Sequence, residues 1–231
     1  MINQVNDRMF SNPDDSQAKT LLNALLEEGV SADSYRKTMF KIGQHLGQKL
    51  AQSLDPSKKY CVASTVEDAD FLAKGIIDAI ESNVNKVFFA CFWNDRQVIG
   101  TESVAPIYNQ YLDPGYEQAN EMIVVKSIMS GSCVVKTNIT AIFEAVKPEA
   151  IYVVAPVMHI ESDKKLELQF PQHIAQLFKY YFLAKDSQRD GDTVIPGIGG
   201  SVYEKLGYGS QRQKNSILPN LVEAKISAAL H

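Results

Sequence analysis

Residues 124–146, VVKSIMSGSCVVKTNITAIFEAV, read as a strand, a turn and a helix in that order. The apolar run stops at Lys126, and a turn of small and hydroxyl-bearing residues follows it. Apolar side chains then recur at spacings of four, three and four, which predicts an amphipathic helix through Val135, Ile139, Ile142 and Val146. A turn that opens a helix often holds a phosphate in α/β proteins, because its backbone N–H groups are free to bind an anion.

Similar alternation of strands and helices extends on both sides of this stretch. Short apolar runs predict strands at 60–64, 86–93, 121–126, 150–157 and 180–184. Helical spacing predicts helices over 34–53 and 68–81. Near-continuous apolar strands separated by helices are typical of an α/β fold with a mainly parallel sheet, here of five strands, flanked by helices on both faces.

The remaining segments suggest how this fold is extended. We expect 1–56 to form a helical N-terminal arm, with 1–16 mobile, and 57–231 to form the α/β domain, the two making one compact unit. The long stretch 94–120 predicts a flexible arm. The glycine-rich stretch 186–209 predicts a C-terminal hood over the sheet.

Composition excludes several classes of function. The net charge of −4 gives no broad basic surface for nucleic acid. No apolar run reaches the roughly 18–20 residues of a membrane span, and the polar N-terminus lacks the features of a signal peptide. The three cysteines have no metal-type spacing, and Cys61 and Cys91 lie in apolar runs as buried thiols. We therefore expect a cytoplasmic protein with no bound metal and no membrane partner.

Three blocks in this order resemble the uracil phosphoribosyltransferases, which have the type I phosphoribosyltransferase fold. They are VVKSIMSGSC (124–133), IYVVAPV (151–157) and VIPGIGGSVYEKLG (194–207). The first is similar to the family's phosphate loop, the second to the strand after its crossover helix, and the third to its base-binding segment. Weaker similarity at 34–50, 64–76 and 92–100 extends the resemblance over roughly 30–210.

The resemblance implies roles for specific residues. The phosphate-binding positions it implies are Lys126, Ser127, Ser130, Gly131, Ser132 and Cys133. The base-binding positions are Ile195, Pro196, Gly197, Ile198, Gly199 and Gly200. The family's diphosphate loop falls on Glu67, Asp68 and Ala69. Arg96 is a further candidate for ligand contact, because the family has an Arg-Asp pair in this region. His159 is another, because it ends a predicted strand.

Charge departs from the family pattern at two of these places. Lys126 stands where the family has the carboxylate beside the ribose hydroxyls, and Glu67 and Asp68 stand where it has an Arg-Ala-Gly segment. The lysine reverses the local charge beside the ribose, and the two carboxylates would repel a diphosphate. For each feature a purely structural interpretation also stays open: Ser130 or Ser132 as a helix cap, Lys126 as the end of a strand, and Glu67 with Asp68 as favourable charges at a helix N-terminus.

Two hypotheses follow. The protein binds a nucleotide or another phosphate-bearing ligand on this scaffold, with transferase activity weakened, altered or lost, and this is the hypothesis we favour. Alternatively, it is an active phosphoribosyltransferase that makes UMP from uracil and phosphoribosyl pyrophosphate, with Mg²⁺ as cofactor. In both, the partner is a small nucleotide or nucleobase, the catalytic residues are undefined, and the resemblance implies a homodimer.

Overall fold

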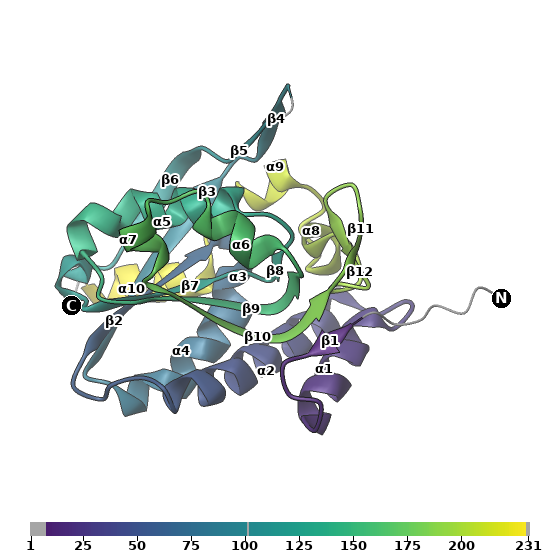
Figure 1. Ribbon diagram of the computed structural model, residues 1–231, viewed down its shortest axis with the longest axis horizontal. Coiled ribbons are helices and arrows are strands. Elements are labelled where there is room, and N and C mark those ends of the chain that lie inside the picture. The colour runs from purple at the N-terminus through teal and green to yellow at the C-terminus, as the bar shows by residue number, and fades with distance from the viewer. Residues whose placement is uncertain (1–7, 101, 230–231) are drawn as a thin grey trace.

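A computed structural model describes residues 8–100 and 102–229, and it shows one central sheet with helices on both faces (Figure 1). The N-terminal half comprises β1 (Met9–Phe10), α1 (Ser16–Leu26), α2 (Ala32–Ala51), β2 (Lys59–Thr65), α3 (Val66–Asp68), η1 (Ala69–Ala73), α4 (Lys74–Ile80), η2 (Glu81–Asn83), β3 (Lys86–Asn94), β4 (Gln97–Ile99), β5 (Glu102–Val104) and β6 (Ile107–Leu112). The C-terminal half comprises η3 (Tyr116–Gln118), β7 (Glu121–Val125), β8 (Ile128–Met129), α5 (Cys133–Val146), β9 (Ile151–His159), α6 (Ser162–Glu167), α7 (Gln172–Ala175), β10 (Phe178–Asp186), β11 (Gln188–Asp190), β12 (Thr193–Ile195), α8 (Val202–Lys205), α9 (Gln211–Lys214) and α10 (Asn220–Ala229).

The sheet confirms the predicted α/β class and the five predicted strands. Its order is β1-β10-β9-β7-β2-β3-β6, and the short β8 also pairs with β9. The predicted strands are β2, β3, β7, β9 and β10, and each pairs in parallel with its neighbours among them. The structure adds β1 and β6, which pair antiparallel at the two edges.

Both faces of the central strands are buried, which explains why their sequences are apolar throughout rather than alternating. Along β2, Tyr60 and Val62 belong to one core cluster, whereas Cys61 and Ala63 belong to the other. The first cluster packs against α1, α2 and α4, and the second packs against α5. Figure 1 shows α2 and α4 on one side of the sheet and α5, α6 and α7 on the other.

Two helical segments meet backbone to backbone because glycines lie at the contact. A Cβ atom at Gly43 of α2 would lie 2.3 Å from the carbonyl oxygen of Leu72. Likewise, a Cβ atom at Gly75 would lie 2.3 Å from the carbonyl oxygen of Phe40. Helix α2 therefore fixes the segment 66–80, whose first residues include the predicted diphosphate-loop positions.

Part of the expected mobile N-terminus is ordered. Strand β1 pairs with β10 through Met9 and Phe10. Arg8 donates two hydrogen bonds, of 2.8 and 2.7 Å, to the carboxylate of Asp186. The prediction of mobility is therefore wrong for 8–16, because a buried ion pair and a strand hold this segment. Residues 1–7 lie outside the described part of the chain.

The expected flexible arm over 94–120 is also more ordered than predicted. Residues 107–112 form β6, which extends the main sheet beyond β3. Between β3 and β6, β4 and β5 pair antiparallel and project from the body of the molecule (Figure 1). The sequence did not indicate β6 because Tyr108, Asn109 and Gln110, three exposed residues with polar groups, make up its centre.

In the described ranges, no helix combines the length and the apolar character needed to cross a membrane.

Candidate functional site

The candidate site lies where β2, β3 and β7 end. Parallel strands bring their carboxyl ends to one edge of a sheet, and ligands of open α/β sheets bind outside that edge. Thr65 ends β2 and begins the helical segment that carries Glu67 and Asp68. Lys126 follows β7 directly, and the turn after it leads into α5 at Cys133. Three segments that are far apart in the sequence therefore converge here.

A cavity of about 230 Å³ occupies this convergence. It is lined by the phosphate-turn segment, the start of α5, the tip of the β11–β12 hairpin and the hood: Arg96, Lys126, Ile128, Ser130, Gly131, Cys133, Val134, Val135, Asp192, Thr193, Val194, Gly200, Ser201, Val202 and Tyr203. Six predicted site residues share this lining: Arg96, Lys126, Ser130, Gly131, Cys133 and Gly200. The fold thus assembles the predicted phosphate turn, part of the hood and Arg96 around one space.

The turn itself is open toward the cavity. Ser132 is the N-cap residue of α5, but its side chain makes no capping hydrogen bond to the helix. A Cβ atom at Gly131 would meet nothing within 4 Å. Side-chain capping by Ser132, one of the two structural alternatives for this turn, is therefore absent. The first residues of this 14-residue helix, Cys133 to Val135, line the cavity, and the first N–H groups of a helix have no partner within it.

Lys126 pairs directly with the two carboxylates of the diphosphate-loop positions. Its Nζ lies 2.7 Å from Oδ2 of Asp68 and 3.1 Å from Oε1 of Glu67. It also donates a hydrogen bond of 3.2 Å to Oγ of Ser127. Side chains of Glu67 and Asp68 are 2% and 1% exposed, so the pairs are buried. Lys126 therefore offsets part of the negative charge of these two carboxylates inside the protein.

A second lysine, Lys214 of α9, completes this ion network. Its side chain is 2% exposed, and its Nζ lies 3.2 Å from Oε2 of Glu67. It donates a hydrogen bond of 3.1 Å to the backbone oxygen of Asn94 and lies over the Tyr203 ring, 5.5 Å from the centroid. Sequence reasoning missed Lys214 because 210–216 is uniformly polar, and nothing in its spacing sets one residue apart.

The charges of this network favour the ionised forms of Glu67 and Lys126. Burial opposes ionisation of Glu67, but the charges of Lys126 and Lys214 outweigh it and lower the pKa of the carboxyl to about 2. Burial also disfavours the charge on Lys126, yet Asp68 and Glu67 together raise the pKa of its ammonium group above the ordinary value. Burial raises the pKa of the nearby Tyr203 to about 12. The network thus pairs two acidic side chains, Glu67 and Asp68, with two basic ones, Lys126 and Lys214.

The residues present do not fit the Mg²⁺ that the resemblance implies for an active transferase. Magnesium binds carboxylate oxygens and substrate phosphates. Here both carboxylates are paired with lysines. In Asp68, Oδ2 contacts Lys126, and Oδ1 is buried without a hydrogen-bond partner among the described residues. Across 8–100 and 102–229, no group of three or more His, Cys, Asp or Glu side chains is placed to hold a metal ion.

The predicted base-binding segment is fixed through its backbone. Gly197 N–H donates to Oδ2 of Asp186 at 2.8 Å, and Arg8 donates to the Gly197 carbonyl. The Tyr35 hydroxyl donates to the Ile198 carbonyl at 2.9 Å. The peptide bond Ile195–Pro196 is cis. Packing thus uses the polar backbone groups of 197–198, and of the predicted base-binding residues only Gly200 lines the cavity.

The other predicted residues lie beside the cavity or away from it. Ser127 is fully buried and accepts a hydrogen bond from Lys126. Ala69 begins the π-helical turn η1, a local irregularity that often occurs near functional sites. His159 ends β9, is 4% exposed, and accepts a hydrogen bond at Nδ1 from the N–H of Glu161. It does not line the cavity, so the structure does not bring it together with the turn.

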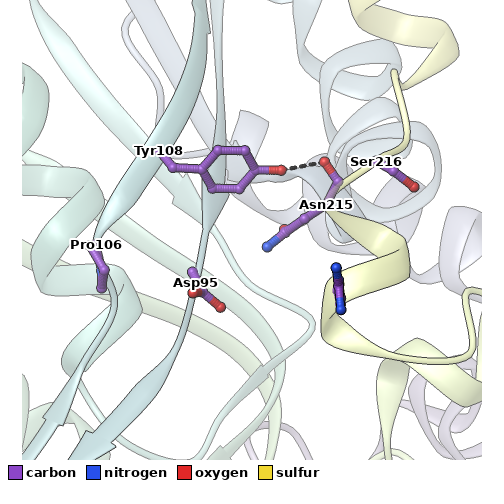
Figure 2. A pocket seen from close by; sticks show the side chains of 6 residues that line it. Asp95, Pro106, Tyr108, Asn215 and Ser216 are labelled. Carbon is purple, nitrogen blue, oxygen red and sulfur yellow. Dashed lines mark hydrogen bonds between the residues drawn. The ribbon is translucent and has the colours of Figure 1, made fainter.

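A larger, more open cavity of about 530 Å³ lies beyond α9 (Figure 2). Asp95, Pro106, Tyr108, Arg212, Asn215 and Ser216 line it. Figure 2 shows the Tyr108 ring reaching across to Asn215, whose backbone oxygen accepts a hydrogen bond from the Tyr108 hydroxyl. None of the predicted site residues belongs to this lining, so the smaller cavity is the candidate functional site.

Comparisons with known proteins identify the fold. Neither a protein-family model nor a curated protein matches the chain. Among solved structures, the AQ2163 protein from Aquifex aeolicus aligns with a TM-score of 0.65 at 17% identity, covering 87% of this chain and 98% of that one. The adenine phosphoribosyl transferase of Trypanosoma brucei aligns with a TM-score of 0.50 at 9% identity, covering 78% and 85%. The chain is an α/β protein with the type I phosphoribosyltransferase fold.

Proposed function

We propose that this protein binds a nucleotide or another phosphate-bearing ligand at the turn Ser130–Cys133 and that its transferase activity is weakened, altered or lost. The uncapped start of α5 supports the first part, because helix N-termini and their amides bind phosphate without help from side chains. The resemblance of 124–133 to a phosphate loop points to the same residues.

The ion network of Lys126 with Glu67 and Asp68 carries the second part of the proposal. A diphosphate brought to this wall would find both lysines already paired with the carboxylates of Glu67 and Asp68. Removing one partner of a buried ion pair costs about 3–5 kcal/mol, so the lysines are not readily released to a ligand. The described residues of this wall therefore offer a diphosphate no free positive charge.

Cavity size supports a small ligand. The space of about 230 Å³ is below the roughly 300–1,000 Å³ of typical pockets for drug-sized ligands. A phosphate group with an attached sugar suits this volume better than phosphoribosyl pyrophosphate with its metal ion. The base-binding role of 195–200 and the homodimer remain proposals, the latter to be tested by sedimentation equilibrium.

The test is calorimetric titration with UMP, ribose 5-phosphate, inorganic phosphate and phosphoribosyl pyrophosphate with Mg²⁺, beside an assay for pyrophosphate release with uracil. We expect UMP or ribose 5-phosphate to bind and no pyrophosphate to be released at an enzymatic rate. Turnover at an ordinary rate would show the alternative, an active uracil phosphoribosyltransferase, to be correct.

Gly131 offers a matched pair of variants for the phosphate turn. A Cβ atom at this position meets nothing within 4 Å, so neither Gly131→Ala nor Gly131→Asp creates a clash at Cβ. We expect Gly131→Asp to abolish binding of the phosphate ligands, because its carboxylate competes for the same amides, and Gly131→Ala to retain it. Equal binding by both variants would remove the turn as the phosphate site.

A further inference from the structure

Arg96 and Asp192 form an ion pair between two walls of the candidate cavity. Arg96 Nη2 lies 2.9 Å from Oδ1 of Asp192, and both residues belong to the cavity lining. Arg96 follows β3, whereas Asp192 lies between β11 and β12 at the tip of the hood hairpin. The pair therefore joins the base of the projecting arm to the hood at the candidate site.

The two cations of this lining differ in how far they are available to a ligand. Lys126 donates to Glu67, Asp68 and Ser127, which uses all three of its N–H groups, and it is 12% exposed. Arg96 is 30% exposed, and its partner Asp192 is 55% exposed. A solvent-exposed ion pair contributes only about 0–1 kcal/mol, whereas breaking a buried pair costs several times more. An incoming anion can therefore displace Asp192 from Arg96 but cannot displace the carboxylates from Lys126.

Arg96 is also held in place independently of Asp192. Its Nε donates to Oγ of Ser103 at 3.0 Å, and its backbone oxygen accepts a hydrogen bond of 2.9 Å from Gln211. The guanidinium group thus stays at the cavity when Asp192 leaves. A guanidinium binds phosphate through charge-assisted, often paired hydrogen bonds, which are stronger than an exposed pair with a carboxylate.

We propose that Arg96 binds the anionic group of the ligand and that Asp192 competes with the ligand for it, so that the Arg96–Asp192 pair is exchanged when the ligand binds. This inference rests on the proposed function, because it concerns the same phosphate site. In this proposal the turn and Arg96 both bind the phosphate of the ligand. Asp192, at the tip of the hairpin, regulates how readily a ligand reaches Arg96. Ligand binding then releases the hairpin tip from the arm.

Asp190 provides a matched control for the test. It is an exposed carboxylate two residues away on the same hairpin, and removing it changes the net charge by the same amount. Titrations with UMP and with inorganic phosphate would compare the wild type, Asp192→Asn, Asp190→Asn, Arg96→Gln and the double variant Arg96→Gln/Asp192→Asn. Circular dichroism would establish that each variant is folded.

We expect Asp192→Asn to bind about two- to fivefold more tightly than Asp190→Asn, the range that an exposed ion pair provides. Arg96→Gln should bind about tenfold or more weakly, because it loses a charged hydrogen bond. In the double variant, the gain from Asp192→Asn should disappear, since the group for which Asp192 competes is gone.

Each other outcome overturns a separate statement. If Asp192→Asn and Asp190→Asn bind the ligands equally, the exchange is wrong and the proposed function stands. The same holds if Arg96→Gln binds them as the wild type does while Gly131→Asp does not bind them. If neither UMP nor inorganic phosphate binds the wild type or Asp192→Asn, the phosphate site itself is wrong, and the exchange is wrong with it.

Discussion

At the scale of single residues, Lys126 determines the character of this site. In the sequence, Lys126 and the pair Glu67-Asp68 look like two separate reversals of charge relative to the family that the chain resembles. In the structure they are one feature, because the lysine lies 2.7 Å from Asp68 and 3.1 Å from Glu67. A pair of opposed substitutions can persist together when each compensates the other.

Replacing Lys126 by methionine should lower the free energy of unfolding by about 3 kcal/mol, because it leaves buried carboxylates with too few countercharges. The control is Lys165→Met, which removes an exposed pair with Glu161 and should cost less than about 1 kcal/mol. Urea denaturation measures both. Equal losses in the two variants would show that the Lys126 pairs contribute no more than surface ones.

The lowered pKa of Glu67 predicts acid sensitivity. Its folded value of about 2 lies below the ordinary 4.5, so its contribution to stability is fully present above pH 4.5 and is lost as the pH falls toward 2. The difference in unfolding free energy between the wild type and Glu67→Gln should therefore shrink by roughly 3 kcal/mol across this window. Urea denaturation at several pH values measures it, and a constant difference would contradict an ionised, paired Glu67.

At the scale of elements, the crossing of α2 over the segment 66–80 positions Glu67 and Asp68. The crossing depends on glycines, since a Cβ atom at Gly75 would lie 2.3 Å from the Phe40 carbonyl oxygen and 2.9 Å from the Gln44 nitrogen. Helical spacing in the sequence predicts both helices, but it does not indicate that they touch at their backbones.

Gly75→Ala should therefore destabilise the protein by about 1–3 kcal/mol, although alanine is normally the better helix former. Gly131→Ala is the control, because its new methyl group meets open space. Thermal unfolding of the two variants tests the prediction. A Gly75→Ala protein as stable as the wild type would mean that the helices separate without cost.

At the scale of the whole molecule, one buried network ties together the beginning, middle and end of the α/β unit. Glu67 follows β2, Asn94 ends β3, Lys126 follows β7 and Lys214 ends α9. The C-terminal segment is therefore part of the site as well as a cover for the sheet. It contributes Lys214, which together with Lys126 lowers the pKa of Glu67.

Lys214→Met should loosen this segment. We expect the backbone amides of 214–217, which hydrogen-bond to the preceding turn, to exchange about tenfold or more faster with deuterium than in the wild type. Arg212→Met on the same helix is the control, because Arg212 is exposed. If both variants exchange alike, Lys214 does not anchor the segment.

The sequence alone determined the α/β class, the five parallel strands and the position of the turn before α5, because these depend on local apolar patterns. The edge strand β6 and the ordering of 8–16 did not follow from it, since polar residues form β6 and a distant partner, Asp186, holds Arg8. The resemblance to the uracil phosphoribosyltransferases indicated the positions, Lys126 and Glu67-Asp68, where the charge is opposite to that of the family. Only the tertiary structure decided that Lys126, Glu67, Asp68 and Lys214 neutralise one another, because Coulomb energy depends on distances in space between residues up to 147 positions apart in the chain.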